Sequence, residues 1–490
     1  MNATFPTTDI AIQDLMDISG VRFGTSGARG QVVDMTNEVS FAYTLAFLKA
    51  ISAVSGRVAL AIDLRPSSPD IAAACAAAIR HAGLEVDFCG AIPTPTLAYY
   101  AQTQGLPAIM VTGSHIPFDR NGIKFYGLTG EITKADEVNI SRAEVTIPEE
   151  IRAIPLTGIN RSAYEHYVDR YLQFFPAKDL AGMRLGFYEH SCVGRDLLRE
   201  LLEGLGAQVI SLGRTEQFVP IDTEAVSEAD VQQARDWAEQ YGFDAILSTD
   251  GDSDRPLLGD ERGNWFRGDI AGILCAQYLG AQALVTTVSC NTAAELCGSF
   301  QKVVRTRIGS PYVIAGIEEL IHSGVRNVVG FEPNGGFLLG SSIEKSGRTL
   351  PSLLTRDAVL PILCLLSMAK EKGGMVSELP RDLPARFTAS DRIQNFPTET
   401  SRSLLRSLVT STDVMDAMLA DLCGKVVNIN QTDGLRVTFE NSEIVHFRPS
   451  GNAPELRCYA ESASQDRSEM LVREGLRRMQ TRYDCLQRVS

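Results

Sequence analysis

The chain alternates between short apolar runs and longer segments with helical periodicity. In the first third, apolar runs at 57–63, 84–89 and 108–111 alternate with helical patterns at 66–83 and 96–104. Short apolar runs bounded by turn residues predict buried strands. Strands that alternate with helices predict a mostly parallel sheet covered by helices. We therefore expect an α/β domain at the start of the chain.

The same order of elements recurs twice further along. Strand-like runs lie at 183–188, 208–212, 243–248, 283–288, 303–307 and 325–331, and helical patterns lie at 194–206, 228–241, 292–300 and 311–323. In each unit a late strand ends at a polar loop that carries glycine. The order of elements repeats although the residues do not, which indicates a divergent structural repeat. We expect three similar α/β domains with mixed sheets.

The pattern changes past about residue 385. Short strand-like runs are separated by the turn pairs Asp433-Gly434 and Asn441-Ser442, and a charged amphipathic helix follows over 465–483. This pattern predicts a small C-terminal α+β domain. The predicted domain boundaries are 1–158, 159–265, 266–384 and 385–490.

Composition narrows the class of protein. The chain has 490 residues, of which 44% are hydrophobic and 22% charged, as in ordinary soluble proteins. Its net charge of -14 argues against general affinity for nucleic acid. No apolar run approaches the roughly 18 residues of a membrane span, and the N-terminus lacks a signal-peptide pattern. The ten cysteines form no C-x-x-C pair. We expect a cytoplasmic protein with no nucleic-acid or membrane partner.

One stretch, 111–127, carries the first candidate chemistry. The apolar run before it stops at Thr112-Gly113, and Ser114 and His115 follow. A strand that ends at a glycine and presents a hydroxyl can expose a nucleophile. Alternatively, the stretch is a hairpin in which Asn121-Gly122 forms the turn before a strand that carries Lys124. The two interpretations are compatible.

A second candidate is an acidic loop directly after a strand. Asp250, Asp252 and Asp254 alternate with small residues, so their carboxylates can lie on one side of an extended loop. Three such carboxylates suit a hard divalent cation such as Mg²⁺. An EF-hand is disfavoured because Arg255 stands where that loop requires glycine, although Glu261 falls at its twelfth position. A solvated acidic turn remains the other alternative.

Three further loops carry groups that recognise anions or hydroxyls. Arg29 lies in a glycine-rich segment, 22–30, where the backbone can approach a ligand closely, although a flexible loop is the alternative. Glu332 and Asn334 can hydrogen-bond sugar hydroxyls, unless their loop is a plain turn. A cluster of donors at 448–457 suits a phosphate, or forms a charged hairpin tip. The segment 306–310 is a weaker signal of the same kind.

In order, these loops resemble those of a known superfamily. They read TSGARG at 25–30, TGSHIPFDRNGIK at 112–124, DGDSDR at 250–255, EPNGG at 332–336 and RPSGNAPELR at 448–457. The set resembles the α-D-phosphohexomutase superfamily, specifically bacterial phosphomannomutase/phosphoglucomutase, over nearly the whole chain. The resemblance implies four domains around a central cleft, the first three sharing one α/β core.

The resemblance also implies a reaction and its residues. Phosphorylated Ser114 would give its phosphoryl group to a hexose 1-phosphate, and would take back the other phosphoryl group from the resulting 1,6-bisphosphate. One Mg²⁺ would bind Ser114, Asp250, Asp252 and Asp254. Lys124 and Arg29 would handle protons and charge, and His115 would orient the phosphoserine. The implied substrate-binding residues are Thr25, Ser26, Arg255, Arg307, Gly309, Glu332, Asn334, Arg448, Ser450, Gly451, Asn452 and Arg457.

Two departures from the family pattern concern the substrate. Asn334 replaces the usual serine of the sugar loop, as in the N-acetylglucosamine-phosphate mutase branch, and Asn452 replaces a threonine of the phosphate loop. We expect mannose phosphate as substrate, with glucose phosphate as a second one and hexose 1,6-bisphosphate as activator. Phosphoglucosamine or N-acetylglucosamine-phosphate mutase is the alternative, followed by a phosphoserine-type phosphatase and a catalytically silent sugar-phosphate binder. We expect a monomer or weak dimer.

Overall fold

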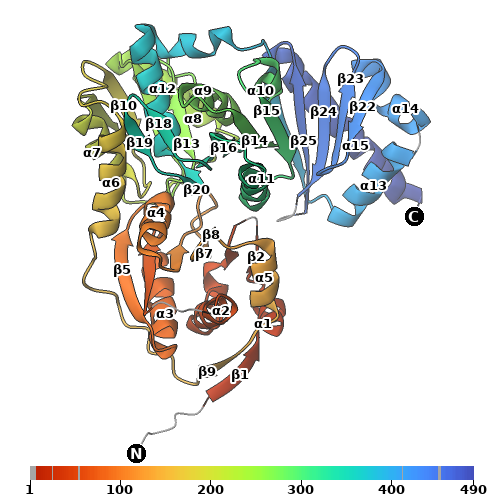
Figure 1. Cartoon of the computed structure of the whole chain (residues 1–490). Helices are drawn as coiled ribbons and strands as arrows, with labels where there is room; N and C mark the ends of the chain where they lie inside the picture. The colour runs from red at the N-terminus through yellow and green to blue at the C-terminus, as the bar shows by residue number, and fades with distance from the viewer. Residues whose placement is uncertain (1–6, 25, 53–55, 411, 451–453, 490) are drawn as a thin grey trace, which may run out of the picture.

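The computed structural model describes residues 7–24, 26–52, 56–410, 412–450 and 454–489. Four larger sheets with their helices follow one another along the chain, as Figure 1 shows from red to blue, and two two-stranded ribbons, β1-β9 and β18-β19, lie beside them. The three α/β domains and the C-terminal α+β domain predicted from the pattern are confirmed.

The first domain is built on a sheet in the order β2-β3-β7-β6-β4-β5, with β8 paired to β7. Its strands are β2 (Arg22–Phe23), β3 (Ala28–Gln31), β4 (Arg57–Ile62), β5 (Glu85–Ala91), β6 (Ala108–Val111), β7 (Arg120–Gly127) and β8 (Gly130–Glu131). Its helices are α1 (Ile12–Ser19), η1 (Val32–Asp34), α2 (Asn37–Ala50), α3 (Ser68–His81), α4 (Thr94–Gln104) and α5 (Lys134–Ser141). A separate ribbon pairs β1 (Thr7–Ala11) with β9 (Glu144–Pro148).

The second and third domains repeat this plan. The second has α6 (Ser162–Phe174), β10 (Arg184–Tyr188), α7 (Arg195–Gly204), β11 (Gln208–Leu212), α8 (Glu228–Tyr241), β12 (Ala245–Thr249) and β13 (Pro256–Gly259). The third has α9 (Gly268–Tyr278), β14 (Ala283–Thr287), α10 (Ala293–Leu296), β15 (Lys302–Thr306), α11 (Ser310–His322), β16 (Val328–Phe331), β17 (Phe337–Leu339), β18 (Ile343–Lys345), β19 (Arg348–Leu350), β20 (Leu353–Asp357), α12 (Val359–Lys372) and η2 (Val376–Asp382).

The repeat is visible in the strand pairing. In each domain a central strand (β4, β10 or β14) has one parallel partner on each side, and the later partner (β6, β12 or β16) is followed by an antiparallel strand (β7, β13 or β17). The connections from β6 to β7, from β12 to β13 and from β16 to β17 are therefore equivalent in topology. They contain Ser114, the three aspartates and Glu332, respectively.

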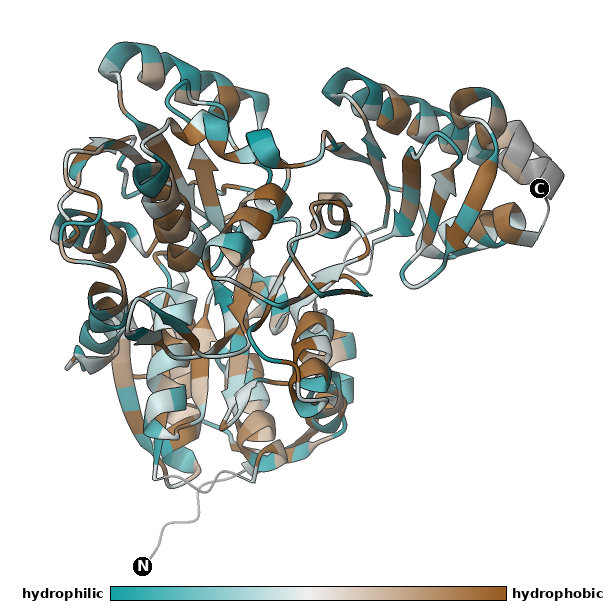
Figure 2. Ribbon diagram, turned by 45° about the horizontal axis from the view of Figure 1, so that its top comes forward, coloured by the Kyte–Doolittle hydropathy of each residue, from teal (hydrophilic) through white to brown (hydrophobic). Residues whose placement is uncertain are grey.

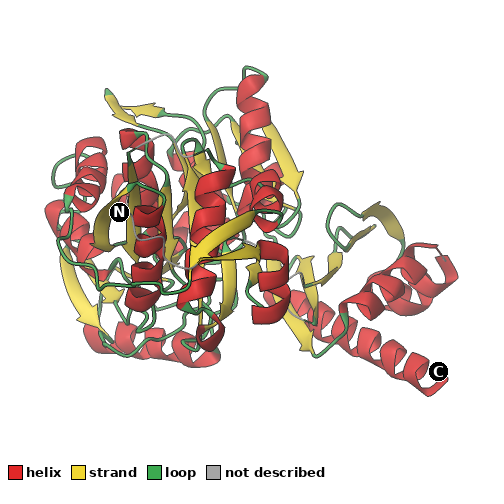
Figure 3. Cartoon of the chain, turned by 90° about the horizontal axis from the view of Figure 1, so that it is seen from below, coloured by secondary structure: helices red, strands yellow, loops and turns green. Residues whose placement is uncertain are grey.

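The fourth domain is an antiparallel sheet in the order β21-β25-β24-β23-β22 with helices on it. Its elements are β21 (Phe387–Gln394), α13 (Thr398–Thr410), α14 (Thr412–Cys423), β22 (Val426–Asn430), β23 (Leu435–Phe439), β24 (Ile444–Pro449), β25 (Glu455–Ser462) and α15 (Gln465–Val489). Figure 3 shows this domain beside the other three, with α15 extending away from them.

Side chains alternate between the two faces of the first-domain sheet, and each face contacts a different hydrophobic cluster. Ala59, Ala61 and Met110 face a hydrophobic cluster that continues through the second and third domains, whereas Leu60 and Ile109 face a second cluster with α2 and α3. Figure 2 shows hydrophobic residues, in brown, along the strands and the helices of these domains. The fourth domain has its own cluster. The first three domains thus share one continuous apolar core, which fixes their relative positions.

The hairpin turn predicted at Asn121-Gly122 is wrong. Both residues lie inside β7, opposite Gly30 and Arg29 of β3. Gly122 is needed there because a Cβ would lie 2.7 Å from the Ala28 carbonyl oxygen, and the Asn121 amide donates to Ser67 Oγ at 2.8 Å. The helix predicted over 292–300 is also shorter, since α10 ends at Leu296. The prediction for the fourth domain missed α13, α14 and β21.

All ten cysteines are free thiols, and most are buried. Among helices in the described part of the chain, none combines the length and apolar character needed to cross a bilayer.

His446 makes the fourth domain sensitive to acid. It is 1% exposed, its Nε2 donates to the Asp433 carbonyl at 2.6 Å, and burial lowers its pKa from 6.5 to about 4. Between those two pH values the unfolded chain binds a proton that the folded domain does not, so stability falls as the pH falls, by about 1.4 kcal/mol per pH unit. We expect His446→Gln to flatten the decline in melting temperature between pH 7 and pH 5. An unchanged slope in a variant that is folded at pH 7 would contradict this assignment.

Candidate active site

Ser114 lies in a strained turn just beyond β6. Its φ is 54°, in the left-handed region, which costs an L-residue on the order of 1–2 kcal/mol. Hydrogen bonds to Thr112 and Asp63, which follow the strands β6 and β4, hold the turn in place. The Ser114 amide donates to Thr112 Oγ1 at 2.8 Å, and that hydroxyl donates to Asp63 Oδ2 at 2.7 Å. The strain is thus offset by a buried hydrogen-bond chain.

Arg65 binds the main chain of the same loop. Its guanidinium donates to the carbonyls of Ser114 at 2.9 Å, Ile116 at 2.5 Å, Pro117 at 2.7 Å and Arg120 at 3.0 Å. The side chain is fully buried and pairs with Asp63. A carbonyl-rich loop with a buried cation at its centre has a defined shape, since each carbonyl that lost its donor would be left unsatisfied.

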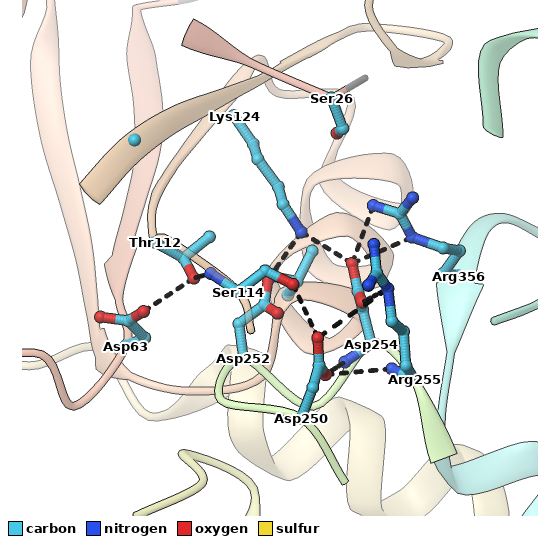
Figure 4. Close-up of polar contacts among 12 residues, drawn as sticks. Ser26, Asp63, Thr112, Ser114, Lys124, Asp250, Asp252, Asp254, Arg255 and Arg356 are labelled. Atoms are coloured by element: carbon cyan, nitrogen blue, oxygen red, sulfur yellow. Dashed lines mark hydrogen bonds and ion pairs between the residues drawn. The ribbon is translucent and has the colours of Figure 1, made fainter. Parts of the chain in front are cut away.

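The three aspartates converge as the spacing predicts. Asp250, Asp252 and Asp254 are fully buried, and one carboxylate oxygen from each lies within 4.8 Å of the others. Figure 4 shows them below Ser114, whose Oγ donates to Asp250 Oδ2 at 2.6 Å. Complete burial excludes the solvated turn. The loop joins strands β12 and β13 rather than two helices, which excludes the EF-hand.

The loop is docked against the first domain. Thr94, at the start of α4, donates from its amide to the Asp252 carbonyl at 3.0 Å and from Oγ1 to Asp252 Oδ2 at 2.5 Å. Lys124 on β7 reaches Asp252 Oδ2 at 2.6 Å and Asp254 Oδ2 at 2.7 Å. The Ser114 loop and the acidic loop are therefore brought together by contacts between two domains.

The donor set fits a hard divalent cation. Asp252 Oδ1 and Asp254 Oδ1 are buried and accept no hydrogen bond from the described residues, and only Asp254 Oδ1 has an ion-pair contact, with Arg255 Nε at 3.6 Å. Buried carboxylate oxygens without a donor are costly unless a cation lies beside them. With the Ser114 oxygen next to Asp250, these groups form an all-oxygen site of the kind that Mg²⁺ prefers.

The carboxylates differ in charge state because their neighbours differ. Burial and the charges of Asp252 and Asp254 raise the pKa of Asp250 to about 8. Burial opposes ionisation of Asp254 too, but Arg356, Lys124 and Arg255 outweigh it, and the pKa of Asp254 is lowered. Its lowered pKa keeps the Asp254 carboxylate ionised.

Cationic groups surround the serine. Arg255 Nη1 lies 2.8 Å from His115 Nδ1, which is 3.4 Å from Ser114 Oγ. Burial, then Arg255, then Arg29 lower the pKa of His115 well below its usual value, so the imidazole is neutral. Burial and the charges of Arg255 and Arg356 lower the pKa of Arg29 to about 10. Arginines from the first three domains converge here, as an anionic phosphoryl group requires.

The loop after β16 contributes Glu332 and Asn334, both buried. Glu332 Oε2 accepts from Arg356 Nη1 at 3.3 Å, and Asn334 Oδ1 accepts from the Gly336 amide at 2.9 Å. Thr223 of the second domain donates to the Asn334 carbonyl at 2.7 Å. The Gly335 amide donates to the Glu332 carbonyl at 3.0 Å, so the loop does contain a turn, and Arg356 joins it to the acidic cluster.

Ser26, Arg448 and Arg457 lie beside charged residues of other segments. Ser26 donates to Glu131 on β8. Arg448 pairs with Asp433 at 3.1 Å, and Asp433 also accepts from the Ile308 amide at 3.0 Å, so the segment before Gly309 touches the fourth domain. Burial acts against the charge on Arg457, but Tyr459 and Glu224 keep its pKa raised.

Some predicted residues are placed elsewhere or not described. Ser450 is buried, with its amide bonded to the Glu455 carbonyl at 2.8 Å. Arg307 is exposed, lies just before α11, and stacks over the Tyr312 ring of that helix, 5.6 Å from the centroid, so the structure does not bring it to the acidic cluster. Thr25, Gly451 and Asn452 fall outside the described residues.

Four family models match the chain in sequence. They describe the phosphoglucomutase/phosphomannomutase α/β/α domains I, II and III and the C-terminal domain, and they match residues 20–147, 165–263, 267–387 and 391–476. The chain belongs to the phosphoglucomutase/phosphomannomutase family. The superfamily inferred from the loops is confirmed.

Individual relatives agree. A phosphomannomutase of Salmonella muenchen is 48% identical over 92% of this chain and 94% of its own length. A phosphomannomutase of Sinorhizobium fredii is 43% identical over 93% of this chain and 98% of its own length. A phosphoglucosamine mutase of Deinococcus radiodurans is 27% identical over 84% of this chain and 98% of its own length. A solved family protein of Burkholderia thailandensis shares the fold with a TM-score of 0.71, at 19% identity over 93% of this chain and 96% of that one.

Several site residues of this family member were missed from the sequence. Asp63, Arg65, Thr94, Glu131 and Arg356 all contact the loops just described. A signal existed for some of them: Asp63-x-Arg65 and Arg356-Asp357 are charged pairs at the ends of apolar strands. The Thr112 partner of Asp63 and the Ser114 partner of Arg65 each lie 49 residues further along the first domain, whereas Arg356 contacts Asp254 of the second domain. Contacts between such distant segments could not be inferred from the sequence.

We expect Arg65→Met to destabilise the protein by about 3 kcal/mol or more, because it leaves Asp63 and four carbonyls without their buried cation. Chemical denaturation and limited proteolysis within 114–120 would measure the loss. The exposed Arg152→Met is the matched control, since its side chain is 70% exposed. Equal stability of the two variants would contradict the role assigned to Arg65.

Proposed function

We propose that this protein is a Mg²⁺-dependent phosphohexomutase that interconverts mannose 1-phosphate and mannose 6-phosphate, with glucose phosphates as a second substrate pair. The observation that carries the proposal is the contact of Ser114 Oγ with the buried triad at Asp250, 2.6 Å away. A serine hydroxyl beside three carboxylates and three arginines suits reversible phosphoryl transfer, in which positioning and charge stabilisation supply most of the catalysis.

The proposed reaction has two transfers. The O6 hydroxyl of a hexose 1-phosphate attacks the phosphorus on Ser114, the bond from phosphorus to Ser114 Oγ breaks, and the O6 proton leaves through the Lys124–Arg29 side of the site. The 1,6-bisphosphate turns around, and Ser114 Oγ loses its proton and attacks the phosphorus on O1. The bond from O1 to phosphorus breaks, O1 takes up a proton, and hexose 6-phosphate departs. Mg²⁺ held by Asp250, Asp252, Asp254 and the phosphoserine would supply charge stabilisation. Hexose 1,6-bisphosphate would recharge a dephosphorylated Ser114.

Each loop has an assigned part. His115, neutral and beside Ser114, orients the phosphoserine, and Arg255 meets the phosphoryl oxygens. Glu332 and Asn334 bind sugar hydroxyls. The distal phosphate is held by Arg448, Ser450, Asn452 and Arg457, together with the backbone at Gly451. Thr25, Ser26, Arg307 and Gly309 complete the substrate contacts. The buried position of Glu332 beside Asp254's partner Arg356 supports placing the sugar between these loops.

The preference for mannose rests on the relatives. Those named phosphomannomutase are 43% and 48% identical, whereas those named phosphoglucosamine mutase are 27–30% identical. An amino-sugar substrate is the second candidate because of Asn334. We further propose a cytoplasmic monomer or weak dimer that has no nucleic-acid or membrane partner, with domain boundaries near 158, 265 and 384.

A comparison of substrates tests the sugar assignment. With Mg²⁺ and a trace of hexose 1,6-bisphosphate, we expect kcat/KM for mannose 1-phosphate to equal or exceed that for glucose 1-phosphate. We expect glucosamine 1-phosphate to react at least ~10-fold more slowly, because its amine replaces a hydroxyl that the sugar loop is built to bond. A faster reaction with the amino sugar would contradict the mannose assignment and leave the family intact.

Removal of metal tests the role of the triad. We expect a chelator to abolish turnover and added Mg²⁺ to restore it. Asp252→Asn should weaken Mg²⁺ binding by about 100-fold or more, since loss of a carboxylate ligand exceeds the 10–100-fold cost of losing an outer partner. Calorimetric titration measures it. Asp236→Asn, on the exposed side of α8, is the control. Unchanged affinity in Asp252→Asn would show that the cation binds elsewhere.

A further inference from the structure

Arg356 lies between two loops: the acidic loop at 250–255, here called the metal loop, and the loop at 332–336, here called the sugar loop. It stands at the end of β20 in the third domain, and its side chain is 2% exposed. Its Nε and Nη2 contact Asp254 Oδ2 at 3.1 Å and 3.0 Å, and its Nη1 contacts Glu332 Oε2 at 3.3 Å. Figure 4 shows the guanidinium directed at Asp254. One planar cation thus joins two buried carboxylates of different loops and domains.

Packing fixes the stem of Arg356. A Cβ at Gly336 would lie 2.5 Å from Arg356 Cδ, so the second glycine of the sugar loop makes room for this side chain. The next residue, Asp357, is anchored by Tyr167 Oη at 2.6 Å and by the Val359 amide at 2.9 Å. The backbone and the aliphatic part of Arg356 are therefore fixed. Only the guanidinium can shift, and such a shift changes how its hydrogen bonds are shared between Asp254 and Glu332.

We propose that Arg356 is a positioning residue that couples hexose-phosphate binding at Glu332 to divalent-cation binding at Asp254. This inference rests on the proposed function. A sugar hydroxyl that donates to Glu332 takes over the hydrogen bond that Arg356 Nη1 supplies in the free protein. The Arg356 guanidinium can then hydrogen-bond to the Asp254 carboxylate alone and keep it in the orientation that a cation requires. Linkage makes the effect reciprocal, so the cation also favours the sugar.

A lysine cannot replace this arginine. Two nitrogen atoms of the guanidinium bind Asp254 and the third binds Glu332, whereas the lysine ammonium is a single point charge on a flexible side chain. We therefore expect the charge alone to restore little of the coupling.

The test is calorimetric titration of MgCl₂ into dephosphorylated protein, with and without mannose 6-phosphate. Without a bisphosphate no turnover occurs, so the readout is binding. In the wild type we expect the sugar phosphate to tighten Mg²⁺ binding about fivefold or more. In Arg356→Gln we expect Mg²⁺ binding ~10-fold weaker and the tightening absent. Arg356→Lys should bind Mg²⁺ with intermediate affinity and show little tightening.

Arg305→Gln is the matched control. Arg305 is a mostly buried arginine of the same domain that pairs with Glu295 at 2.6 Å, away from the metal loop. It should lower the melting temperature while retaining the coupling. The inference is overturned if sugar phosphate leaves Mg²⁺ affinity unchanged in the wild type, or if a folded Arg356→Lys or Arg356→Gln retains full coupling. If the wild type interconverts no hexose phosphate in a separate assay, the proposed function fails instead.

Discussion

The structure of the site depends on burying three carboxylates of one short loop side by side. Like charges in a low-dielectric interior repel strongly, so such a loop is stable only with cations beside it. Here the cations come from different domains: Lys124 from the first, Arg255 from the second and Arg356 from the third. The requirement for charge balance therefore ties the assembly of the three α/β domains to the formation of the site. The proposed divalent cation would complete the balance at Asp252 Oδ1 and Asp254 Oδ1, which accept no hydrogen bond from the described residues.

The internal repeat explains how separate domains supply one site. The loops after β6, β12 and β16 occupy the same topological position, between a parallel strand and an antiparallel one. Each loop has specialised for a different task, with Ser114 in the first, the acidic triad in the second and Glu332 in the third. Because the three sheets share one apolar core, these equivalent edges face a common centre, and the fourth domain adds Arg448 beside the segment that precedes Gly309.

Much of this could be predicted from the sequence because it is local. The alternation of strands and helices gives the repeat, and the two-residue spacing of Asp250, Asp252 and Asp254 gives their convergence. What could not be predicted depends on contacts between distant segments. Arg65 and Arg356 look like ordinary charges after strands, and only the folded chain shows that they bind the Ser114 and Glu332 loops. Asn121-Gly122 has the sequence of a turn, but pairing with β3 places it in a strand.

The central claim is that Ser114 carries the phosphoryl group in the reaction. The direct measurement is the mass of the intact protein, followed by peptide mapping, after incubation with mannose 1,6-bisphosphate and Mg²⁺. The account predicts addition of one phosphoryl group at Ser114, its loss to added mannose 1-phosphate with formation of the bisphosphate, and no addition in Ser114→Ala. Phosphorylation at another residue, or full mutase activity in Ser114→Ala, would contradict it.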